Sequence, residues 1–253
     1  MIPCVLFEDE HLLVVNKPAG VNTHSPGPFA GEGIYDWLRH REPRWAKLAI
    51  IHRLDKETSG VMVFGKTAQA NRSLTEQFAS RAICKKYLLL TDRGPKRSAF
   101  VAKSKIARFG DHYASAAVGQ PAETRFVIMA SVPPVMRLKP GVRLIEAEPL
   151  TNRTHQIRVH AAESGFPILG DTLYGGTPFA RVCLHAAEIA FTHPDSGERV
   201  VYCAPADFTA DPGLALRAAI IDPGETNAFR LIHGASDGWP GLYVDQLGDF
   251  ALS

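Results

Sequence analysis

The sequence is compatible with an α+β domain: the pattern of its segments fits this class, and its length and composition fit a globular fold. Short apolar segments of strand length alternate with a few segments whose apolar residues recur at helical spacing. The chain has 253 residues, of which 45% are hydrophobic, enough for one large domain or two smaller ones with a real core. No apolar stretch approaches the length that spans a bilayer.

The first ninety residues alternate between strand-like and helix-like segments. Apolar runs bounded by turn residues indicate the strands, and Pro18 with Gly20 ends the second of them. Helical spacing of apolar residues indicates the helices, one of which has Thr67 as a suitable N-cap. In chain order the pattern predicts strands at 5–7 and 12–16, a loop at 22–33, a helix at 34–41, a strand at 61–64, a helix from Thr67 to about Ala79 and a strand at 85–90.

Further along, residues 93–120 alternate basic and small residues with two glycines, which predicts an exposed hairpin. Residues 123–128 and 142–147 alternate or run apolar. They predict adjacent antiparallel strands joined by a turn near 138–141.

A helix is expected next, running to Ser164 and closed by Gly165. Three residues could cap its start: Thr151, Asn152 or Thr154. His155 and His160 lie five residues apart, which puts them on different faces of a helix, whereas a metal-binding pair would be four apart. The spacing therefore argues against a zinc hydrolase.

The stretch His52–Gly60 is the strongest candidate for a functional site. Residues 58–60 are turn formers, so the chain should reverse there and place Arg53 and Asp55 at the edge of a sheet. A carboxylate held on a tight turn near a guanidinium stays ionised at neutral pH and can act as a nucleophile. Taken alone, an Arg-x-Asp triplet is more often an ordinary surface ion pair on a loop.

Four ordered motifs set this stretch in context. They are Leu12–Gly20, His52–Gly60 with its H-R-L-D and T-S-G elements, the pair Lys86-Tyr87, and Arg153–His160. Together they resemble the pseudouridine synthases of the RluA family over roughly residues 5–205. The resemblance implies the pseudouridine synthase fold, a mixed and mainly antiparallel sheet with flanking helices and a central cleft.

The same resemblance implies a reaction and three catalytic residues. Specific uridines of structured RNA, either rRNA or tRNA, would be isomerised to pseudouridine without a cofactor or a metal. Asp55 would be the nucleophile, attacking either the base or the sugar. Arg158 would pair with Asp55 and keep it ionised, and Tyr87 would stack on the uracil. Asn152 replaces the glycine usual before Arg-Thr-His. Asparagine tolerates the same left-handed backbone better than most residues, so the exchange affects only the local backbone geometry.

RNA would be held by residues around these three. Arg53 could fill the space of a flipped-out uridine by stacking its guanidinium. The other predicted RNA-binding residues are His52, Lys17, Lys85, Lys86, Arg153 and His155. Residues 81–110 carry a net charge of +8, which suits phosphate binding, although a solvated basic hairpin without a ligand is the alternative.

Cysteines and the N-terminus indicate the compartment. The chain has four cysteines, with no C-x-x-C pair, which argues against a zinc or redox site and favours reduced thiols. Residues 1–4 show no secretory signal. We therefore expect the protein in the cytosol and expect no membrane partner. The first motif lies so near Met1 that no S4-type domain is expected before it.

The last segment differs in character. Residues 201–253 carry a net charge of −5, and residues 226–245 resemble the β-rich segment that precedes the catalytic domain of RlmI-like rRNA methyltransferases. We expect a catalytic domain at 1–208, a linker with a helix at 209–225 and an incomplete β-rich segment at 226–253. A catalytically silent RNA-binding module, or a fragment of a synthase–methyltransferase fusion, is the alternative interpretation.

Overall fold

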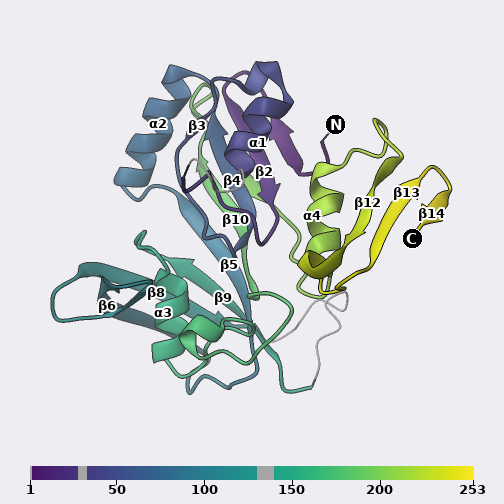
Figure 1. Cartoon of the computed structure of the whole chain (residues 1–253). Helices are drawn as coiled ribbons and strands as arrows, with labels where there is room; N and C mark the ends of the chain where they lie inside the picture. Colours follow the sequence, from purple (N-terminus) through teal and green to yellow (C-terminus); the bar gives the residue numbers. More distant parts are fainter. Residues whose placement is uncertain (1, 28–32, 130–139) are drawn as a thin grey trace.

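The computed structural model describes residues 2–27, 33–129 and 140–253. Within them the strands form one large sheet and one small one (Figure 1). The large sheet contains β1 (Val5–Glu8), β2 (Leu12–Lys17), β3 (Ala49–Ile50), β4 (Ser59–Gly65), β5 (Cys84–Thr91), β6 (Ala99–Phe109), β7 (His112–Ser115), β8 (Gln120–Ile128), β9 (Arg143–Pro149), β10 (Leu184–Thr192) and β11 (Arg199–Cys203). The small sheet contains β12 (Ala228–His233), β13 (Tyr243–Leu247) and β14 (Phe250–Leu252).

Helices flank these sheets. The α-helices are α1 (Ile34–Arg41), α2 (Ala68–Ala79), α3 (Gln156–Glu163) and α4 (Pro212–Ile220). Short 3₁₀ helices are η1 (Pro43–Trp45), η3 (Thr172–Tyr174) and η4 (Gly234–Asp237). No helix in the described residues is both long and apolar enough to cross a membrane.

The large sheet follows the order β1-β2-β4-β10-β5-β9-β8-β6-β7, with β11 added to β10 and β3 to β4. Its pairs are antiparallel except for β4 and β10, which run parallel. Figure 1 shows β5 and β10 passing between an upper half with β2, β4, α1 and α2 and a lower half with β6, β8, β9 and α3. The sheet is thus mixed and mainly antiparallel, as expected.

Gly60 allows the parallel pair to form. Its φ of +119° suits glycine, and a Cβ there would lie 2.2 Å from the carbonyl oxygen of Ala186. β4 and β10 can therefore approach only because residue 60 has no side chain. This fixes the end of the loop that carries Asp55.

Two apolar clusters support the two halves. One packs β5 and β9 against Ile157, Phe166 and Ile168. The other packs β2 and β4 against α1, and it includes Leu54, whose side chain is buried. Burial of one leucine side chain stabilises the folded state by about 1.5–3 kcal/mol, so Leu54 anchors the loop between Arg53 and Asp55.

Most predicted elements are confirmed. The strands, the hairpin within 93–120 and the helix at 34–41 are present, and the Thr67 side chain accepts a hydrogen bond from the backbone of Ala70 at the start of α2. The β8–β9 pair is antiparallel. Residues 28–32 of the expected loop and residues 138–139 of the expected turn lie outside the described residues.

Two local predictions are wrong. The turn expected at residues 58–60 lies at Lys56 and Glu57, because Ser59 and Gly60 already belong to β4. Helix α3 is not capped by Thr151, Asn152 or Thr154: its N-cap is His155, which has a left-handed backbone with φ 55°. The left-handed residue of this loop is therefore His155 and not Asn152.

The C-terminal segment contains helix α4 and the small sheet. Asp211 caps the start of helix α4. Near the end of this helix, the Ala219 carbonyl accepts a hydrogen bond from the Cys4 N–H. Arg217 of α4 bonds Asp237, which ties the helix to η4 next to the small sheet. Several large apolar side chains of this sheet are exposed, namely Tyr243, Leu247, Phe250 and Leu252.

Candidate active site

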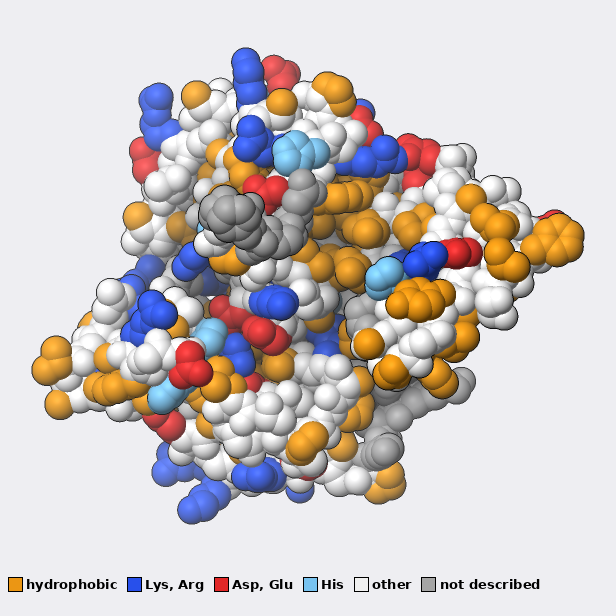
Figure 2. All heavy atoms as spheres, in the orientation of Figure 1, with side chains coloured by type: hydrophobic (Ala, Val, Ile, Leu, Met, Phe, Trp, Pro, Cys, Tyr) orange, Lys and Arg blue, Asp and Glu red, His pale blue; other side chains and the backbone are white. Residues whose placement is uncertain are grey.

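A pocket of about 1000 Å³ opens between the loop before β4, strand β5 and the start of α3. Figure 2 shows acidic, basic and histidine side chains gathered around a hollow in the middle of the molecule. The pocket wall includes the candidate residues Asp55, Tyr87, Arg158, Arg53, His155 and Lys85. The chain therefore brings three distant motifs to one cavity.

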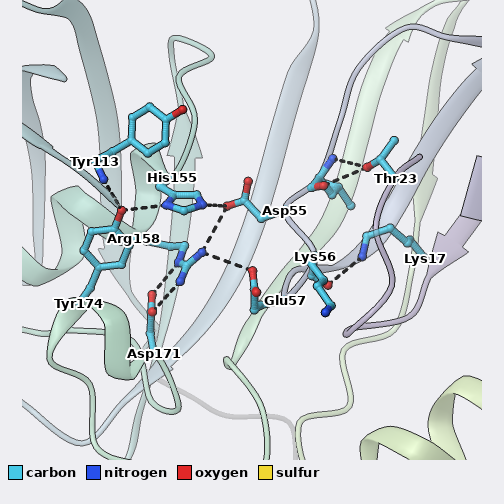
Figure 3. Close-up of polar contacts among 11 residues, drawn as sticks. Lys17, Thr23, Asp55, Lys56, Glu57, Tyr113, His155, Arg158, Asp171 and Tyr174 are labelled. Atoms are coloured by element: carbon cyan, nitrogen blue, oxygen red, sulfur yellow. Dashed lines mark hydrogen bonds and ion pairs between the residues drawn. The ribbon is translucent and has the colours of Figure 1, made fainter. Parts of the chain in front are cut away.

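The backbone around Asp55 is held from both sides (Figure 3). Before it, the Thr23 hydroxyl donates to the Leu54 carbonyl at 2.9 Å and accepts from the Leu54 N–H at 3.1 Å. After it, the Thr58 N–H donates to the Asp55 carbonyl at 3.1 Å and closes the turn. A carboxylate on a backbone fixed in this way keeps one position relative to the pocket.

Lys17 fixes the same turn by hydrogen bonds to backbone carbonyls. Its side chain is fully buried, and its ammonium donates to the carbonyls of Pro18 at 2.9 Å, Val21 at 2.8 Å and Lys56 at 3.3 Å. The expectation that Lys17 contacts RNA is therefore wrong for this conformation, because its nitrogen faces the protein interior. Burial lowers the pKa of Lys17 to about 7.

Arg158 makes its strongest contacts with Asp171. Its Nε and Nη2 each donate to an Asp171 carboxylate oxygen at 2.7 Å. Its remaining group, Nη1, lies 3.4 Å from Glu57 Oε2 and 3.8 Å from Asp55 Oδ2. Arg158 therefore faces the candidate nucleophile, as expected, but a second carboxylate holds it there.

His155, the N-cap of α3, also approaches Asp55. Its Nε2 lies 3.9 Å from Asp55 Oδ2, and its Nδ1 lies 2.8 Å from the Tyr174 hydroxyl oxygen. That oxygen also accepts the Tyr113 N–H at 3.0 Å. The Arg158 guanidinium lies over the Tyr174 ring, 5.0 Å from its centre, so Tyr174 contacts both His155 and Arg158.

Burial opposes the charge on Asp55. The side chain is only 25% exposed, and desolvation raises the pKa of its carboxyl above the ordinary value of 3.8. His155, Arg158 and Lys17 oppose this rise, while Glu57 adds to it. The expectation that a nearby arginine would simply hold Asp55 ionised thus misses the larger effect, which is desolvation.

The facing wall combines an aromatic ring with a buried amine. Tyr87 on β5 lines the pocket, and burial raises the pKa of its hydroxyl, which favours the neutral phenol. Lys85, two residues earlier, bonds Asn152 Oδ1, and burial lowers its pKa to about 8. Strand residues two apart point to the same face, so β5 presents both side chains to the pocket.

Of the other predicted RNA-binding residues, three line the pocket and one does not. Arg53 is exposed and lines the pocket, and Arg153 lines it while donating to the Pro121 carbonyl. His52 also lines it, with its ring stacked on Phe78 and its Nε2 accepting the Val63 N–H. Lys86 points to the other face of β5 and pairs with Glu188 at 3.0 Å, so it does not join the pocket.

Sequence reasoning assigned no chemistry to Asp171 and Tyr174. Both lie in a segment, residues 166–176, that resembles the RluA family but reads as turn and core. A carboxylate and a tyrosine three residues apart at a helical turn were the available signal. Thr23 gave none, because its role depends on a contact with residue 54 across the fold.

Comparisons with known proteins agree on one family. The sequence profile described as RNA pseudouridylate synthase matches residues 11–163. The chain is 39% identical to ribosomal large subunit pseudouridine synthase C of Yersinia pestis, over 81% of this chain and 66% of that protein. It is 37% identical to the RNA pseudouridine synthase YhcT of Bacillus subtilis (strain 168), over 82% of this chain and 69% of that protein.

A solved structure has the same fold. Human RNA pseudouridylate synthase domain containing 1 superposes with a TM-score of 0.64 and 27% identity, covering 85% of this chain and 86% of that one. The chain spans only part of the length of these relatives. It covers 66% of the Yersinia pestis protein and 66% of the protein of the same name from Escherichia coli (strain K12).

Proposed function

This chain belongs to the RNA pseudouridylate synthase family, and we propose that it isomerises specific uridines of structured RNA, in rRNA or tRNA, to pseudouridine. One observation carries the proposal furthest. The Asp55 carboxylate, 25% exposed, stands at the wall of a pocket of about 1000 Å³ with two basic side chains within 4 Å and an aromatic ring on another wall.

The reaction requires little beyond these groups. The bond between ribose C1′ and uracil N1 breaks, the base rotates, and a bond forms between C1′ and C5. The C5 proton leaves to solvent and N1 takes up a proton, so atoms and charge balance without an oxidant or a second substrate. A nucleophilic carboxylate can hold the reacting fragment while the base turns, attacking either the base or the sugar.

In this proposal Asp55 is the nucleophile, and its partial desolvation raises the energy of the free carboxylate before attack. Arg158 stabilises the carboxylate from 3.8 Å and can shorten this contact when substrate excludes water. The Tyr87 ring stacks on the uracil, and its neutral phenol can donate a hydrogen bond to a base carbonyl.

A uridine inside folded RNA must leave its stack, at a cost on the order of a few kcal/mol. Arg53 is exposed beside the nucleophile, so its planar guanidinium can stack where the base was. Phosphates would be bound by the exposed basic residues that follow β5 and line β6, namely Arg93, Lys96, Arg97, Lys105 and Arg108. Such contacts give affinity that depends on salt and little on sequence.

We also propose the division of the chain. Residues 1–208 would form the catalytic domain, 209–225 the linker with α4, and 226–253 the separate β-rich unit. The large sheet ends with β11 at Cys203 and the small sheet begins with β12 at Ala228, which supports these boundaries.

The test is tritium release from RNA labelled at uridine C5, taken from cells that lack this gene so that the site is unmodified. Wild type is compared with Asp55→Asn, and Glu76→Gln on the exposed face of α2 is the matched control. We expect release by wild type and by Glu76→Gln, none by Asp55→Asn, and RNA binding by all three within a small factor.

Other outcomes separate the alternatives. Release by Asp55→Asn would show that Asp55 is not the nucleophile. No release by any protein, together with efficient crosslinking to RNA, would favour a catalytically silent RNA-binding module. Loss of binding in parallel with activity would mean that Asp55 serves binding and not chemistry.

A further inference from the structure

We propose that Tyr174 and His155 form a chain of hydrogen-bond donors that holds the Asp55 carboxylate for attack. The proposal rests on the proposed function, since it assigns these residues a role in that reaction. Both are positioning residues, because they act through Asp55. Figure 3 shows the Tyr174 hydroxyl, the His155 ring and the Asp55 carboxylate in a row, with the backbone nitrogen of Tyr113 joined to the Tyr174 hydroxyl.

One hydrogen-bond direction follows from the atoms involved, and the direction between Tyr174 and His155 is part of the proposal. The Tyr174 oxygen accepts the Tyr113 N–H at 3.0 Å, because a backbone amide can only donate. The hydroxyl hydrogen of Tyr174 remains free to donate, and His155 Nδ1 lies 2.8 Å away. If Tyr174 donates to Nδ1, that nitrogen carries no proton, and in a neutral imidazole the proton is then on Nε2.

Nε2 is the atom that faces the nucleophile. It lies 3.9 Å from Asp55 Oδ2, so the tautomer set by Tyr174 turns an N–H toward the carboxylate. The other tautomer would turn a lone pair toward it, which repels a negative charge. The distance is longer than a hydrogen bond and can close when the substrate enters.

The charged groups around His155 come from three segments of the chain, and β7 adds the uncharged ring of Tyr113. Asp55 and Glu57 face it from the loop before β4, Arg158 from α3 and Asp171 from the loop before η3. Burial lowers the pKa of His155, which supports a neutral ring despite the three carboxylates. A neutral donor stabilises the carboxylate without neutralising it, so Asp55 remains a nucleophile.

Arg158 does not replace this donor. Two of its three nitrogens, Nε and Nη2, donate to Asp171, and Nη1 is shared between Glu57 and Asp55. His155 therefore supplies the second direction from which the Asp55 carboxylate is oriented. The same N–H would favour departure of Asp55 from either atom it attacks, C1′ of the sugar or a carbon of the base, because the carboxylate recovers its charge when that bond breaks.

The first experiment reads the tautomer directly. Two-bond ¹H–¹⁵N correlation spectra of the ¹⁵N-histidine-labelled protein distinguish a protonated Nδ1 from a protonated Nε2, and His155→Asn identifies the signals of residue 155. We expect Nε2–H in wild type between pH 6 and 8, and a mixture of tautomers in Tyr174→Phe. A wild-type ring with Nδ1–H, or a cationic ring, would overturn the proposal.

The second experiment is a double-mutant cycle on tritium release. Tyr174→Phe keeps the ring over Arg158 and removes only the hydroxyl. We expect kcat to fall about 3- to 10-fold with KM for RNA unchanged, which is within the range for loss of one hydrogen bond between neutral groups. His155→Gln keeps an amide N–H near the position of Nε2. In that background Tyr174→Phe should cost less than about 2-fold.

The control is Tyr35→Phe, which removes a hydroxyl that donates to the Leu48 carbonyl outside the pocket. A purely structural role for Tyr174 would instead give equal losses of kcat in both backgrounds, with a matching loss of stability. That result would refute the proposed chain of hydrogen-bond donors. An Nε2–H tautomer in a wild-type protein that releases no tritium would contradict the proposed function and leave the tautomer assignment standing.

Discussion

Arg158 and Asp171 form a bidentate ion pair inside the protein, with two N···O distances of 2.7 Å and side chains that are 4% and 1% exposed. The pair fixes the plane of the guanidinium and leaves only Nη1 directed at Asp55 and Glu57. A bidentate pair of a guanidinium and a carboxylate fixes the orientation of both groups in addition to attracting them. Asp171 therefore decides where the positive charge of the site is placed.

Asp171→Asn should destabilise the protein by about 3–5 kcal/mol, because it leaves a buried guanidinium without a full partner. We also expect tritium release to fall, since Arg158 loses its fixed plane. Urea unfolding measures the first effect. Asp195→Asn is the control, because its carboxylate is 61% exposed and lies 3.6 Å from His11, so its removal should cost less than about 1 kcal/mol. Equal effects for both variants would contradict the prediction.

Neighbouring lysines on β5 offer a matched pair. Lys85→Ala should raise KM for RNA and make the salt dependence of binding shallower by about one charge, because Lys85 lines the pocket. Lys86→Ala should leave both unchanged within about 2-fold, because Lys86 lies on the other face and pairs with Glu188. Filter binding at several salt concentrations checks both. A larger effect for Lys86 would mean that RNA crosses the opposite face of β5.

What the sequence could predict was local. The Thr67 cap, the helix at 34–41 and the strands depend on neighbours a few residues away, and they formed as expected. The three catalytic candidates were found because their motifs resemble a family, and the fold brings all three to one pocket.

What the sequence did not reveal depended on distant contacts. Lysines are rarely buried, so nothing local indicated that three carbonyls, one of them 39 residues away, surround Lys17. Asparagine tolerates a left-handed backbone, which pointed to residue 152. The structure has this conformation at His155 instead, where the ring lies close to both Asp55 and Tyr174.

Lys17 should make stability depend on pH. Burial lowers its pKa from 10.5 to about 7, so between these values the unfolded chain binds more protons than the folded protein. The free energy of unfolding then rises with pH across this window, by at most about 1.4 kcal/mol per unit. Lys17→Met should remove this rise.

Urea unfolding at pH 7, 8 and 9 measures the slope for Lys17. The exposed Lys47→Met serves as the control and should run parallel to wild type. Parallel curves for Lys17→Met would show that the buried amine keeps its proton across this range.

Asp55→Asn should be inactive but more stable than wild type at neutral pH. Burial raises the pKa of the Asp55 carboxyl, so the folded protein binds more protons than the unfolded chain between pH 3.8 and the raised value. Above that window the ionised carboxylate costs stability, and asparagine removes the cost. The advantage should shrink as pH falls and Asp55 takes up a proton, which thermal unfolding between pH 8 and pH 4 can follow.

Asp207→Asn is a control of opposite sign for this prediction. The backbone N–H of Thr209 donates to Asp207 and lowers its pKa, so asparagine there should reduce stability at neutral pH and less so at low pH. If Asp55→Asn behaved like Asp207→Asn, the contacts of Asp55 with His155 and Arg158 would outweigh its desolvation. The nucleophile would then be a stabilised carboxylate, and attack would have to be driven by substrate binding alone.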